Sequence, residues 1–571
     1  MDTNIQYTQK RYDELSKIDY RNNIIKLSAW KNDKAIIQVP IITKDTNLNN
    51  IKVDISDLKS ENSTISKTNV DAYFIKPNKA YNGEFIGFGG KTGPIPKDTG
   101  INRSEVSDII LNLEPISINK GKLRALWLEF NIPAEANKGV YNAQIKIISD
   151  ELLEVVEFNF EIKVFDIILP DSKDFKRYFD IELWQYPYSS AEYYDVEAFS
   201  KEHFEILKPL MNKYKKIGGS AITTTISEDA WGGQTYSKNE IHYPSMIKWK
   251  KTKDGFKYDY TDFDKWIEFN KGLDIADKII IYSIYPWHSS FTYWEDEELV
   301  YEKFEVSSDR YNRIWSDFLY DLMHHLEEKD WLDNAYIGID EQGLSHEVFD
   351  LIYSIKNSKG QSFKTAGAMD DLVEKYDLAL RMTDLNVGDT AAAKNPKEFT
   401  RLVKERKDKG YRTTLYSCTG HIPGNFSLCE PVESYWTIIN SSRETDGFLR
   451  WAYDAWIENP LEDTTHNSFE PGDTFLIYPD YKDSQSYKVH SSIRLEKMAE
   501  AIRDVNKLRH IKDKAPQLNK DIEKAYEKLK IIPEHRYNLL SDDELQDLIS
   551  EMSEFKKDID RISEKFEKTL R

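Results

Sequence analysis

The second part of the chain alternates short apolar runs with stretches of helical periodicity, and this alternation restricts the folds that it can adopt. Segments with helical spacing, among them 199–214, 263–273, 311–326 and 395–409, separate the apolar runs. Strands that alternate with helices pair in parallel. Eight strand-like runs follow residue 170, at 178–186, 221–226, 278–287, 335–340, 365–369, 378–385, 411–418 and 447–456. Eight such units predict a (β/α)8 TIM-like barrel, and an open doubly wound sheet is the alternative.

The preceding residues follow a different pattern, in which apolar and polar residues alternate in short runs broken by turn residues. These runs lie at 24–28, 34–39, 123–130, 140–147 and 155–164. Alternation of period two with hairpin-scale connections predicts an antiparallel β-sandwich. A glycine-rich stretch at 83–93 does not match a phosphate-binding loop, because Phe85 stands where the spacing of that motif requires glycine.

After Pro479 the chain becomes helical and charged. Ser541 and Glu544 form a capping box before a long amphipathic helix. The apolar stripe of this helix is Leu545, Leu548, Ile549, Met552, Phe555, Ile559, Ile562 and Phe566. We expect the stripe to pack on its own protein, and a partner-binding helix is the alternative.

The length of 571 residues is too great for one hydrophobic core. We therefore expect a multidomain α/β protein with three parts. They are an N-terminal antiparallel β-sandwich at 1–169, a catalytic (β/α)8 barrel at 170–490 and a C-terminal helical segment at 491–571.

Composition excludes several partners and cofactors. The formal net charge of −20 repels phosphate backbones, so nucleic acid is not an expected partner. No stretch approaches the roughly 18 continuous apolar residues of a membrane span. The 11 histidines include no His-Glu-x-x-His pattern, so neither a metal nor a cofactor is predicted.

The first ten residues contain no apolar secretion-signal region, which predicts a cytoplasmic location. The chain has two cysteines, Cys418 and Cys429. In a cytoplasmic setting we expect reduced thiols rather than a disulfide between them.

Two adjacent carboxylates, Asp340 and Glu341, end the fourth apolar run. Side chains just past the carboxyl end of a parallel barrel strand project into the mouth of the barrel, where ligands bind. Burial beside Tyr336, Ile337 and Ile339 would raise the pKa of at least one carboxyl group, and like-charge proximity would separate the two pKa values. A proton donor and a charge stabiliser could then coexist at one pH.

The adjacency of the two carboxylates favours one kind of glycosidase chemistry. Neighbouring residues cannot easily lie on opposite sides of a scissile glycosidic bond, as ordinary glycosidases require. They suit a reaction in which the 2-acetamido oxygen of the substrate attacks the anomeric carbon. We assign Glu341 as the general acid/base and Asp340 as the residue that orients the acetamido N–H.

The stretch GFLRWAYDAWIENP at 447–460 is the most specific of several motifs, with 471–479, 492–496, 258–264 and 282–287. Together these motifs resemble glycoside hydrolase family 123, the β-N-acetylgalactosaminidases, over about residues 20 to 500. The resemblance implies an exo-acting, retaining hydrolase that removes terminal β-linked N-acetylgalactosamine from a glycolipid or oligosaccharide by substrate-assisted catalysis. Asp340 and Glu341 match the Asp-Glu pair of that family.

Aromatic residues at strand ends are candidates for the sugar-binding surface, because aromatic rings pack well on apolar faces and carry a polar edge. By strand position the candidates are Trp184, Trp287, Tyr416, Trp451, Tyr453 and Trp456. We predict Trp451 and Trp456 as walls of the site, and Trp184 and Trp287 as residues at its rim. Tyr416 or Tyr453 is expected to donate its hydroxyl to the acetamido oxygen.

Two other functions are compatible with these residues. Glu341 could act with a nucleophile from another strand, Asp370, Asp384 or Asp454, on a sugar without an acetamido group. The barrel could also bind a sugar without turnover, because a fold alone does not fix a function.

Overall fold

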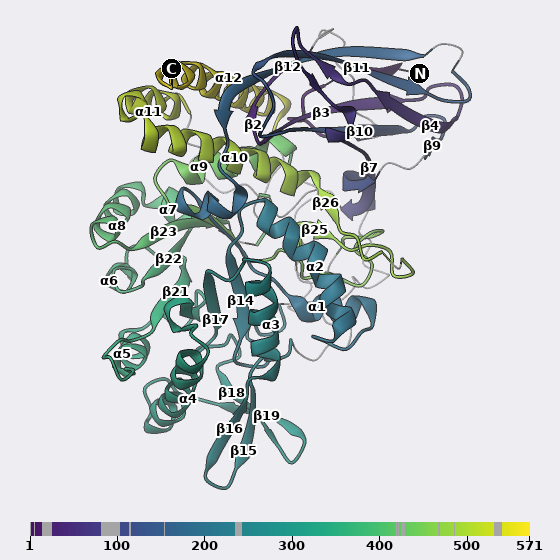
Figure 1. Ribbon diagram of the computed structural model, residues 1–571. Helices are drawn as coiled ribbons and strands as arrows, with labels where there is room; N and C mark the ends of the chain where they lie inside the picture. The colour runs from purple at the N-terminus through teal and green to yellow at the C-terminus, as the bar shows by residue number, and fades with distance from the viewer. Residues whose placement is uncertain are drawn as a thin grey trace.

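The protein is seen here as a computed structural model, in which a β-rich region, a barrel and a group of helices can be distinguished (Figure 1). The β-rich region, from the N-terminal part, lies at the top right, and the barrel lies below it. The C-terminal helices lie at the top left. The structure describes residues 2–4, 6–13, 25–81, 103–112, 116–152, 155–234, 243–417, 419–420, 422–423, 429–465, 469–484, 486–529 and 540–570.

Two sheets make up the N-terminal region. Their strands are β1 (Asp2–Thr3), β2 (Ile25–Lys31), β3 (Asp33–Ile42), β4 (Leu48–Ile55), β5 (Leu58–Lys59), β6 (Thr64–Ile65), β7 (Val70–Tyr81), β8 (Arg103–Asn112), β9 (Ile116–Ile118), β10 (Leu123–Ile132), β11 (Gly139–Ile148) and β12 (Val156–Ile168). One sheet has the order β1-β3-β10-β7-β8, and the other has the order β2-β12-β11-β4-β9 with β5 and β6 beside β11. The pairing is antiparallel except between β2 and β12, which run in parallel.

Apolar side chains of both N-terminal sheets share one buried cluster. Ile37 and Leu128 come from the first sheet, and Tyr141 and Ile162 come from the second. The structure confirms the predicted strands in this region, while the sandwich arrangement stays a prediction. The glycine-rich stretch at 83–93 lies outside the described residues.

Eight parallel strands form a nearly closed barrel. They are β13 (Asp180–Leu183), β14 (Ala221–Thr225), β17 (Lys278–Tyr282), β20 (Ala335–Ile339), β21 (Lys364–Met369), β22 (Asp384–Gly388), β23 (Arg412–Ser417) and β24 (Gly447–Arg450). They pair in the order β13-β24-β23-β22-β21-β20-β17-β14, and a bridge between Ile181 and Gly219 joins the two ends. A doubly wound sheet reverses its strand order part-way, so this continuous order excludes that alternative.

The predicted strand at 378–385 is wrong in its position. Tyr376–Ala379 form the short helix α6, and β22 begins only at Asp384. Leu378 is buried as part of a helix. A short apolar run fits a buried helix as well as a strand, which is why the pattern misled. The other seven predicted runs each coincide with a barrel strand, although some extend into the loop beyond it.

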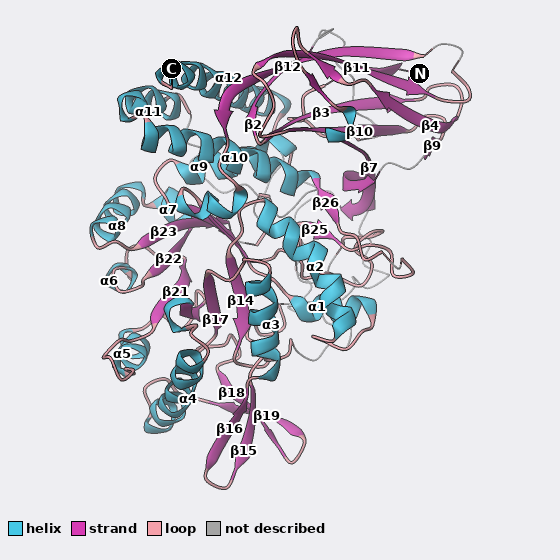
Figure 2. Cartoon of the chain, in the orientation of Figure 1, coloured by secondary structure: helices cyan, strands magenta, loops and turns pink. Residues whose placement is uncertain are grey.

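Helices connect successive barrel strands (Figure 2). They are α1 (Pro187–Tyr194) and α2 (Lys201–Lys216) after β13, α3 (Thr261–Gly272) after β14, α4 (Asp309–Glu328) after β17, α5 (His346–Ser354) after β20, α6 after β21, α7 (Asp389–Lys394) and α8 (Pro396–Asp408) after β22, and α9 (Pro431–Ser442) after β23. Serine caps begin several of them: Ser308 Oγ accepts a hydrogen bond from the backbone N–H of Tyr311 at the start of α4. The apolar side of α4 is fully buried at Phe318 and Leu322.

A smaller sheet of four strands is inserted after two neighbouring barrel strands. Its strands are β15 (Lys248–Thr252), β16 (Gly255–Asp259), β18 (Ser290–Glu295) and β19 (Glu298–Lys303). The first two follow β14 and the last two follow β17. The sheet projects from the bottom of the molecule in Figure 2. Because it follows the carboxyl ends of β14 and β17, it flanks the mouth of the barrel.

The C-terminal part returns to the N-terminal sheets. It contains β25 (Ile477–Tyr478), β26 (His490–Ser492), α10 (Ile493–Lys514), α11 (Asn519–Glu527) and α12 (Asp542–Thr569). Strand β26, at the boundary predicted between barrel and helical segment, pairs with β8, and β25 from the predicted barrel range pairs with β26, so both extend an N-terminal sheet. The predicted capping box at Ser541 is present. Seven members of the predicted stripe of α12, all except Ile549, are buried, which confirms that the stripe packs on its own protein.

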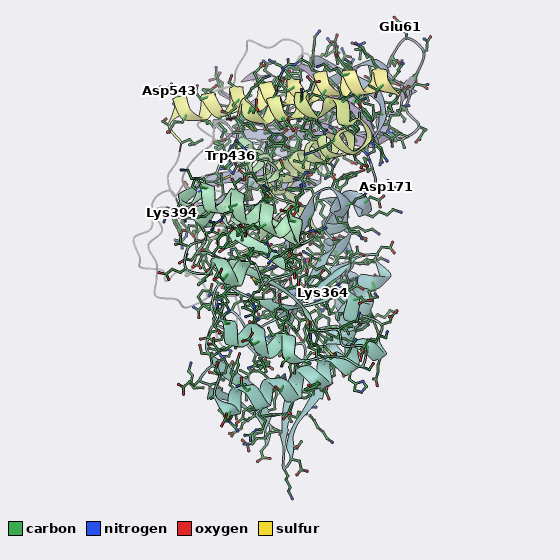
Figure 3. The ribbon with its side chains drawn as sticks, turned by 90° about the vertical axis from the view of Figure 1, so that its left-hand side faces the viewer. Glu61, Asp171, Lys364, Lys394, Trp436 and Asp543 are labelled. Atoms are coloured by element: carbon green, nitrogen blue, oxygen red, sulfur yellow. The ribbon has the colours of Figure 1, made fainter. Side chains whose placement is uncertain are left out.

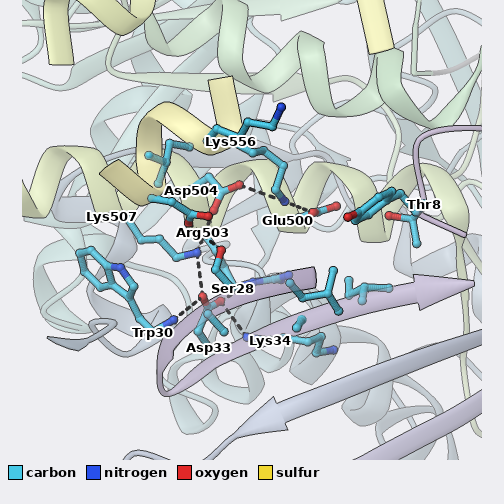
Figure 4. A pocket seen from close by; sticks show the side chains of 18 of the residues that line it. Thr8, Ser28, Trp30, Asp33, Lys34, Glu500, Arg503, Asp504, Lys507 and Lys556 are labelled. Carbon is cyan, nitrogen blue, oxygen red and sulfur yellow. Dashed lines mark hydrogen bonds and ion pairs between the residues drawn. The ribbon is translucent and has the colours of Figure 1, made fainter. Parts of the chain in front are cut away.

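Charged side chains line a cavity of about 330 Å³ between β2, β3, α10 and α12 (Figure 4). Asp33 of β3 contacts Arg503 Nε at 3.1 Å and Lys507 Nζ at 2.7 Å, both from α10. Lys556 of α12 pairs with Glu500 of α10. The Asp33 pairs join the N-terminal sheet to α10, and the Lys556 pair joins the two C-terminal helices to each other.

A fully buried ion pair joins the same parts of the chain. Arg494 Nη2, on α10, lies 3.0 Å from Asp108 Oδ2 on β8, and both side chains are 0% exposed. The hydroxyl of Tyr478 donates to the same carboxylate at 2.6 Å. Arg494 also donates to the backbone carbonyl of Phe475 at 3.0 Å. Neither charge has access to water, so each depends on the other.

Replacing Arg494 with methionine is expected to destabilise the protein by about 3 to 5 kcal/mol, because Asp108 would keep a buried charge without its cation. Urea unfolding followed by tryptophan fluorescence measures this loss. Lys163→Met is the matched control, since Lys163 pairs with Glu564 of α12 while its side chain is 43% exposed. The control should lose less than about 1 kcal/mol. Equal losses in the two variants would contradict the prediction.

Candidate active site

The two adjacent carboxylates lie at the mouth of the barrel. Asp340 is the first residue after β20, which pairs in parallel with β17 on one side and with β21 on the other. The loops after β17 and β21 therefore flank Asp340 and Glu341. Asp340 is 9% exposed, and Glu341 is partly buried.

Both oxygens of Asp340 accept a hydrogen bond. Trp287 Nε1, from the loop after β17, donates to Oδ2 at 2.7 Å, and the backbone N–H of Glu341 donates to Oδ1 at 2.9 Å. Burial raises the pKa of the Asp340 carboxyl, and these two donors act in the opposite direction by favouring the carboxylate. A carboxylate oxygen accepts more than one hydrogen bond. Asp340 can therefore also accept an N–H from a ligand.

Glu341 has a different set of neighbours. The hydroxyl of Tyr416, on β23, donates to Glu341 Oε1. Burial raises the pKa of Glu341 to about 7, and the charges of Asp340 and Asp370 add to the rise. Tyr416 and Lys375 lower it. A carboxyl group with this pKa is partly protonated at neutral pH, so it can donate a proton and later accept one.

A glycine makes room for the contact between Tyr416 and Glu341. Gly388, the last residue of β22, lies opposite Tyr416 of β23 in the sheet. A Cβ atom on Gly388 would lie 3.2 Å from the Tyr416 hydroxyl oxygen and 3.3 Å from Cζ. Any larger residue would press on the ring that carries the hydroxyl.

Four of the six predicted sugar-binding aromatic residues lie in one place. Trp184, Tyr416 and Trp451 belong to a single buried cluster in the barrel, and Trp287 packs against it. Trp287 contacts Asp340, and Tyr416 contacts the neighbouring carboxylate. The structure thus brings these four residues together with the predicted catalytic pair.

Tyr453 and Trp456 lie elsewhere. The hydroxyl of Tyr453 donates to the backbone carbonyl of Leu210 at 3.1 Å, and Trp456 Nε1 donates to that of Ile477 at 2.7 Å. Both are fully buried in a different cluster, which packs the helices. Strand β24 ends at Arg450. The alternation of side-chain directions along a strand therefore does not extend to Tyr453 and Trp456. We leave both out of the proposed site.

The aromatic cluster also contains residues outside the predicted sugar-binding set. Tyr186, Trp231, Tyr243 and Tyr282 all belong to it. The ring of Tyr282 lies 4.7 Å from that of Trp184, and the ring of Trp231 lies 5.0 Å from that of Tyr186. Tyr282 ends β17, so the inward positions of that strand could have indicated it. Tyr243 follows a long connection and gives no such signal.

The alternative nucleophile Asp384 lies at the opposite end of the barrel. It is the first residue of β22 and contacts Lys278, the first residue of β17, at 2.5 Å. Lys278 also contacts Asp180 at 2.8 Å and Glu182 at 3.1 Å, both on β13. This network occupies the amino ends of the strands, so Asp384 cannot reach a substrate in the mouth.

The other two alternatives follow carboxyl ends of strands. Asp370 comes directly after β21 and pairs with Lys375 at 3.2 Å. Asp454 is fully buried, and its Oδ1 accepts a hydrogen bond from the backbone N–H of Tyr186 at 2.7 Å. Burial raises the pKa of Asp454 to about 7, which makes it a weaker nucleophile near neutral pH than an ordinary carboxylate.

Neither a metal-binding cluster nor a membrane-spanning helix is found in the described part of the chain. There, no three His, Cys, Asp or Glu side chains are grouped so that they could hold a metal ion. None of the helices in the described ranges is both long and apolar enough to cross a membrane. Cys429 is buried, which raises the pKa of its thiol, and Cys418 lies outside the described residues.

Comparison with known proteins identifies the family. A family model described as glycoside hydrolase 123, catalytic domain, matches residues 184–511, and the model of the N-terminal domain of the same family matches 1–149. A solved family 123 glycoside hydrolase from Clostridium perfringens, analysed for glycolipid glycan hydrolysis, is 32% identical to this chain. The match covers 100% of this chain and 99% of that chain with a TM-score of 0.92.

Other comparisons add little. A β-glucuronidase from Parabacteroides merdae is 8% identical over 80% of this chain and 49% of that chain, and its TM-score of 0.26 carries no argument. None of the curated proteins compared with the chain matches it. The two family models and the full-length similarity agree, and the chain belongs to glycoside hydrolase family 123.

Proposed function

We propose that the protein is a retaining, exo-acting β-N-acetylgalactosaminidase in which the 2-acetamido group of the substrate is the nucleophile. The observation that carries this proposal is the Asp340–Glu341 pair, whose members are adjacent in sequence but have different hydrogen-bond partners. Membership of family 123 supports glycoside hydrolysis. The glycolipid glycan hydrolysis studied in the Clostridium perfringens relative supports the same class of substrate for this chain.

In the first step, Glu341 gives its proton to the glycosidic oxygen while the acetamido carbonyl oxygen attacks the anomeric carbon. The bond from the anomeric carbon to the aglycone breaks, and the aglycone leaves as an alcohol. The sugar becomes a cyclic oxazolinium ion. Asp340 accepts a hydrogen bond from the acetamido N–H and stabilises the positive charge that develops on that group.

In the second step, water attacks the anomeric carbon from the side that the aglycone left. Glu341, now a carboxylate, takes a proton from this water, and the oxazolinium ring opens to restore the acetamido group. Two inversions at one carbon give net retention. Both steps use the proton affinity of Glu341, whereas Asp340 serves through its charge and its fixed position.

The aromatic residues supply the shape of the site. Trp287 fixes Asp340 by its indole hydrogen bond. Trp451 and Trp184 line the barrel interior with the other members of the cluster, where rings offer apolar surface to a sugar face. Tyr416 is assigned to Glu341 rather than to the acetamido oxygen, because its hydroxyl already donates to that carboxylate.

Replacing Asp340 with asparagine should lower kcat for nitrophenyl β-N-acetylgalactosaminide by about 100- to 1000-fold, since a neutral amide does not stabilise the developing charge. The wild type should release nitrophenol from this substrate and leave the plain β-galactoside intact, because the latter lacks the nucleophile. Asp350→Asn is the matched control. It makes the same chemical change on α5, where the Asp350 side chain is 70% exposed, and should keep full activity.

Three outcomes would contradict this proposal. Cleavage of the plain galactoside at a similar rate would show that an enzyme side chain is the nucleophile. Full activity in Asp340→Asn would remove Asp340 from the reaction. Binding of N-acetylgalactosamine without turnover of any aryl glycoside would favour the sugar-binding alternative.

Activity should fall as the pH rises through about 7, because the first step requires the protonated form of Glu341. A profile of kcat/KM against pH measures this alkaline limb in the free enzyme. Glu341→Gln should lose turnover while keeping affinity for the sugar, since the amide has nearly the same shape but no proton to give. A nitrophenyl leaving group made more acidic should restore part of the rate. An unchanged alkaline limb in the residual activity of Glu341→Gln would place the acid on another residue.

A further inference from the structure

The loop between β21 and α6, residues 370–375, is held in a fixed turn beside the carboxylate pair. Its strand pairs in parallel with β20, so the loop starts at the same edge of the sheet as Asp340. Leu372 is fully buried. Asp371 Oδ1 accepts hydrogen bonds from two backbone N–H groups further along the loop, at 2.8 and 3.0 Å. These contacts direct the end of the loop, where Lys375 stands.

Lys375 connects the loop to Glu341. Its Nζ lies 3.4 Å from the backbone carbonyl oxygen of Glu341 and 3.2 Å from Asp370 Oδ1. One ammonium group therefore bridges the backbone of the proposed acid and the carboxylate that follows the neighbouring strand. The side chain of Lys375 is 30% exposed and that of Asp370 is 55% exposed.

Groups from at least three elements act on Glu341. Asp340 follows its own strand, Tyr416 lies on β23, and Asp370 and Lys375 belong to the loop after β21. Asp370 raises the pKa of Glu341 and Lys375 lowers it. The two loop charges therefore oppose each other at the proposed acid.

We propose that Lys375 is a positioning residue of the reaction, which holds the backbone of Glu341 and neutralises Asp370 beside the proton that Glu341 transfers. This inference rests on the proposed function and adds to it a residue outside the catalytic pair. Asp370 is then a counter-ion rather than a nucleophile. The pair differs from a passive surface ion pair because one of its members also donates to the main chain of the acid.

The test compares the alkaline limb of kcat/KM for nitrophenyl β-N-acetylgalactosaminide in three variants. Lys375→Met removes the positive charge and leaves Asp370 unbalanced, so the limb should move to higher pH. Asp370→Asn leaves Lys375 unbalanced, so the limb should move to lower pH. The expected shifts are about 0.2 to 0.7 pH unit, the range that partly exposed charge pairs produce. The double variant should return close to the wild-type limb, and added salt should reduce both single shifts.

Lys364→Met is the matched control. Lys364 is the first residue of the same strand and lies at its amino end, where its Nζ donates to the backbone carbonyl of Asp333. Its place in the molecule is labelled in Figure 3. The same change of charge there should leave the limb in place. Lys375→Arg keeps the charge and should restore the wild-type profile.

Opposite shifts in the two single variants support the inference, because a purely structural defect lowers activity without moving the limb in opposite directions. Shifts in the same direction, or none, overturn it. A loss of several orders of magnitude in Asp370→Asn would also overturn it and would make Asp370 the nucleophile. A failure of the proposed function itself would be distinguishable, because the wild type would then not cleave the substrate at all. If Lys375→Met does not fold, Asp370→Asn and Lys375→Arg decide the question.

Discussion

A single buried lysine organises the interior of the barrel. Lys278 Nζ contacts the carboxylates of Asp180, Glu182 and Asp384, which come from strands on both sides of it. The other oxygen of Glu182 accepts the indole N–H of Trp184 at 3.0 Å. The charged layer at the amino ends of the strands is thereby tied to the aromatic layer above it. Burial at the mouth raises the proton affinity of Asp340 and Glu341.

The asymmetry of the two adjacent carboxylates results from topology. Successive residues at the end of a strand point in different directions, so each meets a different neighbouring element. Asp340 meets the loop after β17 and receives Trp287, whereas Glu341 meets β23 and receives Tyr416. The same dipeptide in a surface loop would have water on both sides and two ordinary carboxyl groups.

The periodicity of the sequence predicted most of the fold because burial imposes it directly. Seven of eight barrel strands and the stripe of α12 follow from spacing alone. The predicted strand at 378–385 was misplaced because a buried position requires an apolar residue in a helix as well as in a strand, and Leu378 is buried in a helix. The parallel pairing of β2 with β12 and the return of β26 to β8 depend on contacts between distant segments, which no local pattern records.

A candidate site residue could be predicted where its place depends on position along a strand, but not where it depends on the direction of its side chain. Asp340 and Glu341 could be placed at the mouth because a barrel brings the carboxyl ends of all its strands to one face. The direction of the Trp456 side chain could not be predicted, because the chain leaves the strand before this residue. Lys375 gave no signal, since a lysine in a polar loop is ordinary until the loop is seen to bend back onto Glu341.

The junction between β26 and α10 has a mechanical consequence. Strand β26 ends at Ser492 and pairs with β8, and α10 begins at Ile493 without an intervening linker. The helix that follows the barrel therefore grows directly out of a sheet built by the N-terminal region. The N-terminal region cannot swivel about a hinge at this junction without breaking strand pairing. Without the N-terminal region, β26 would keep β25 as a neighbour but would lose β8, and its exposed edge would be a template for aggregation.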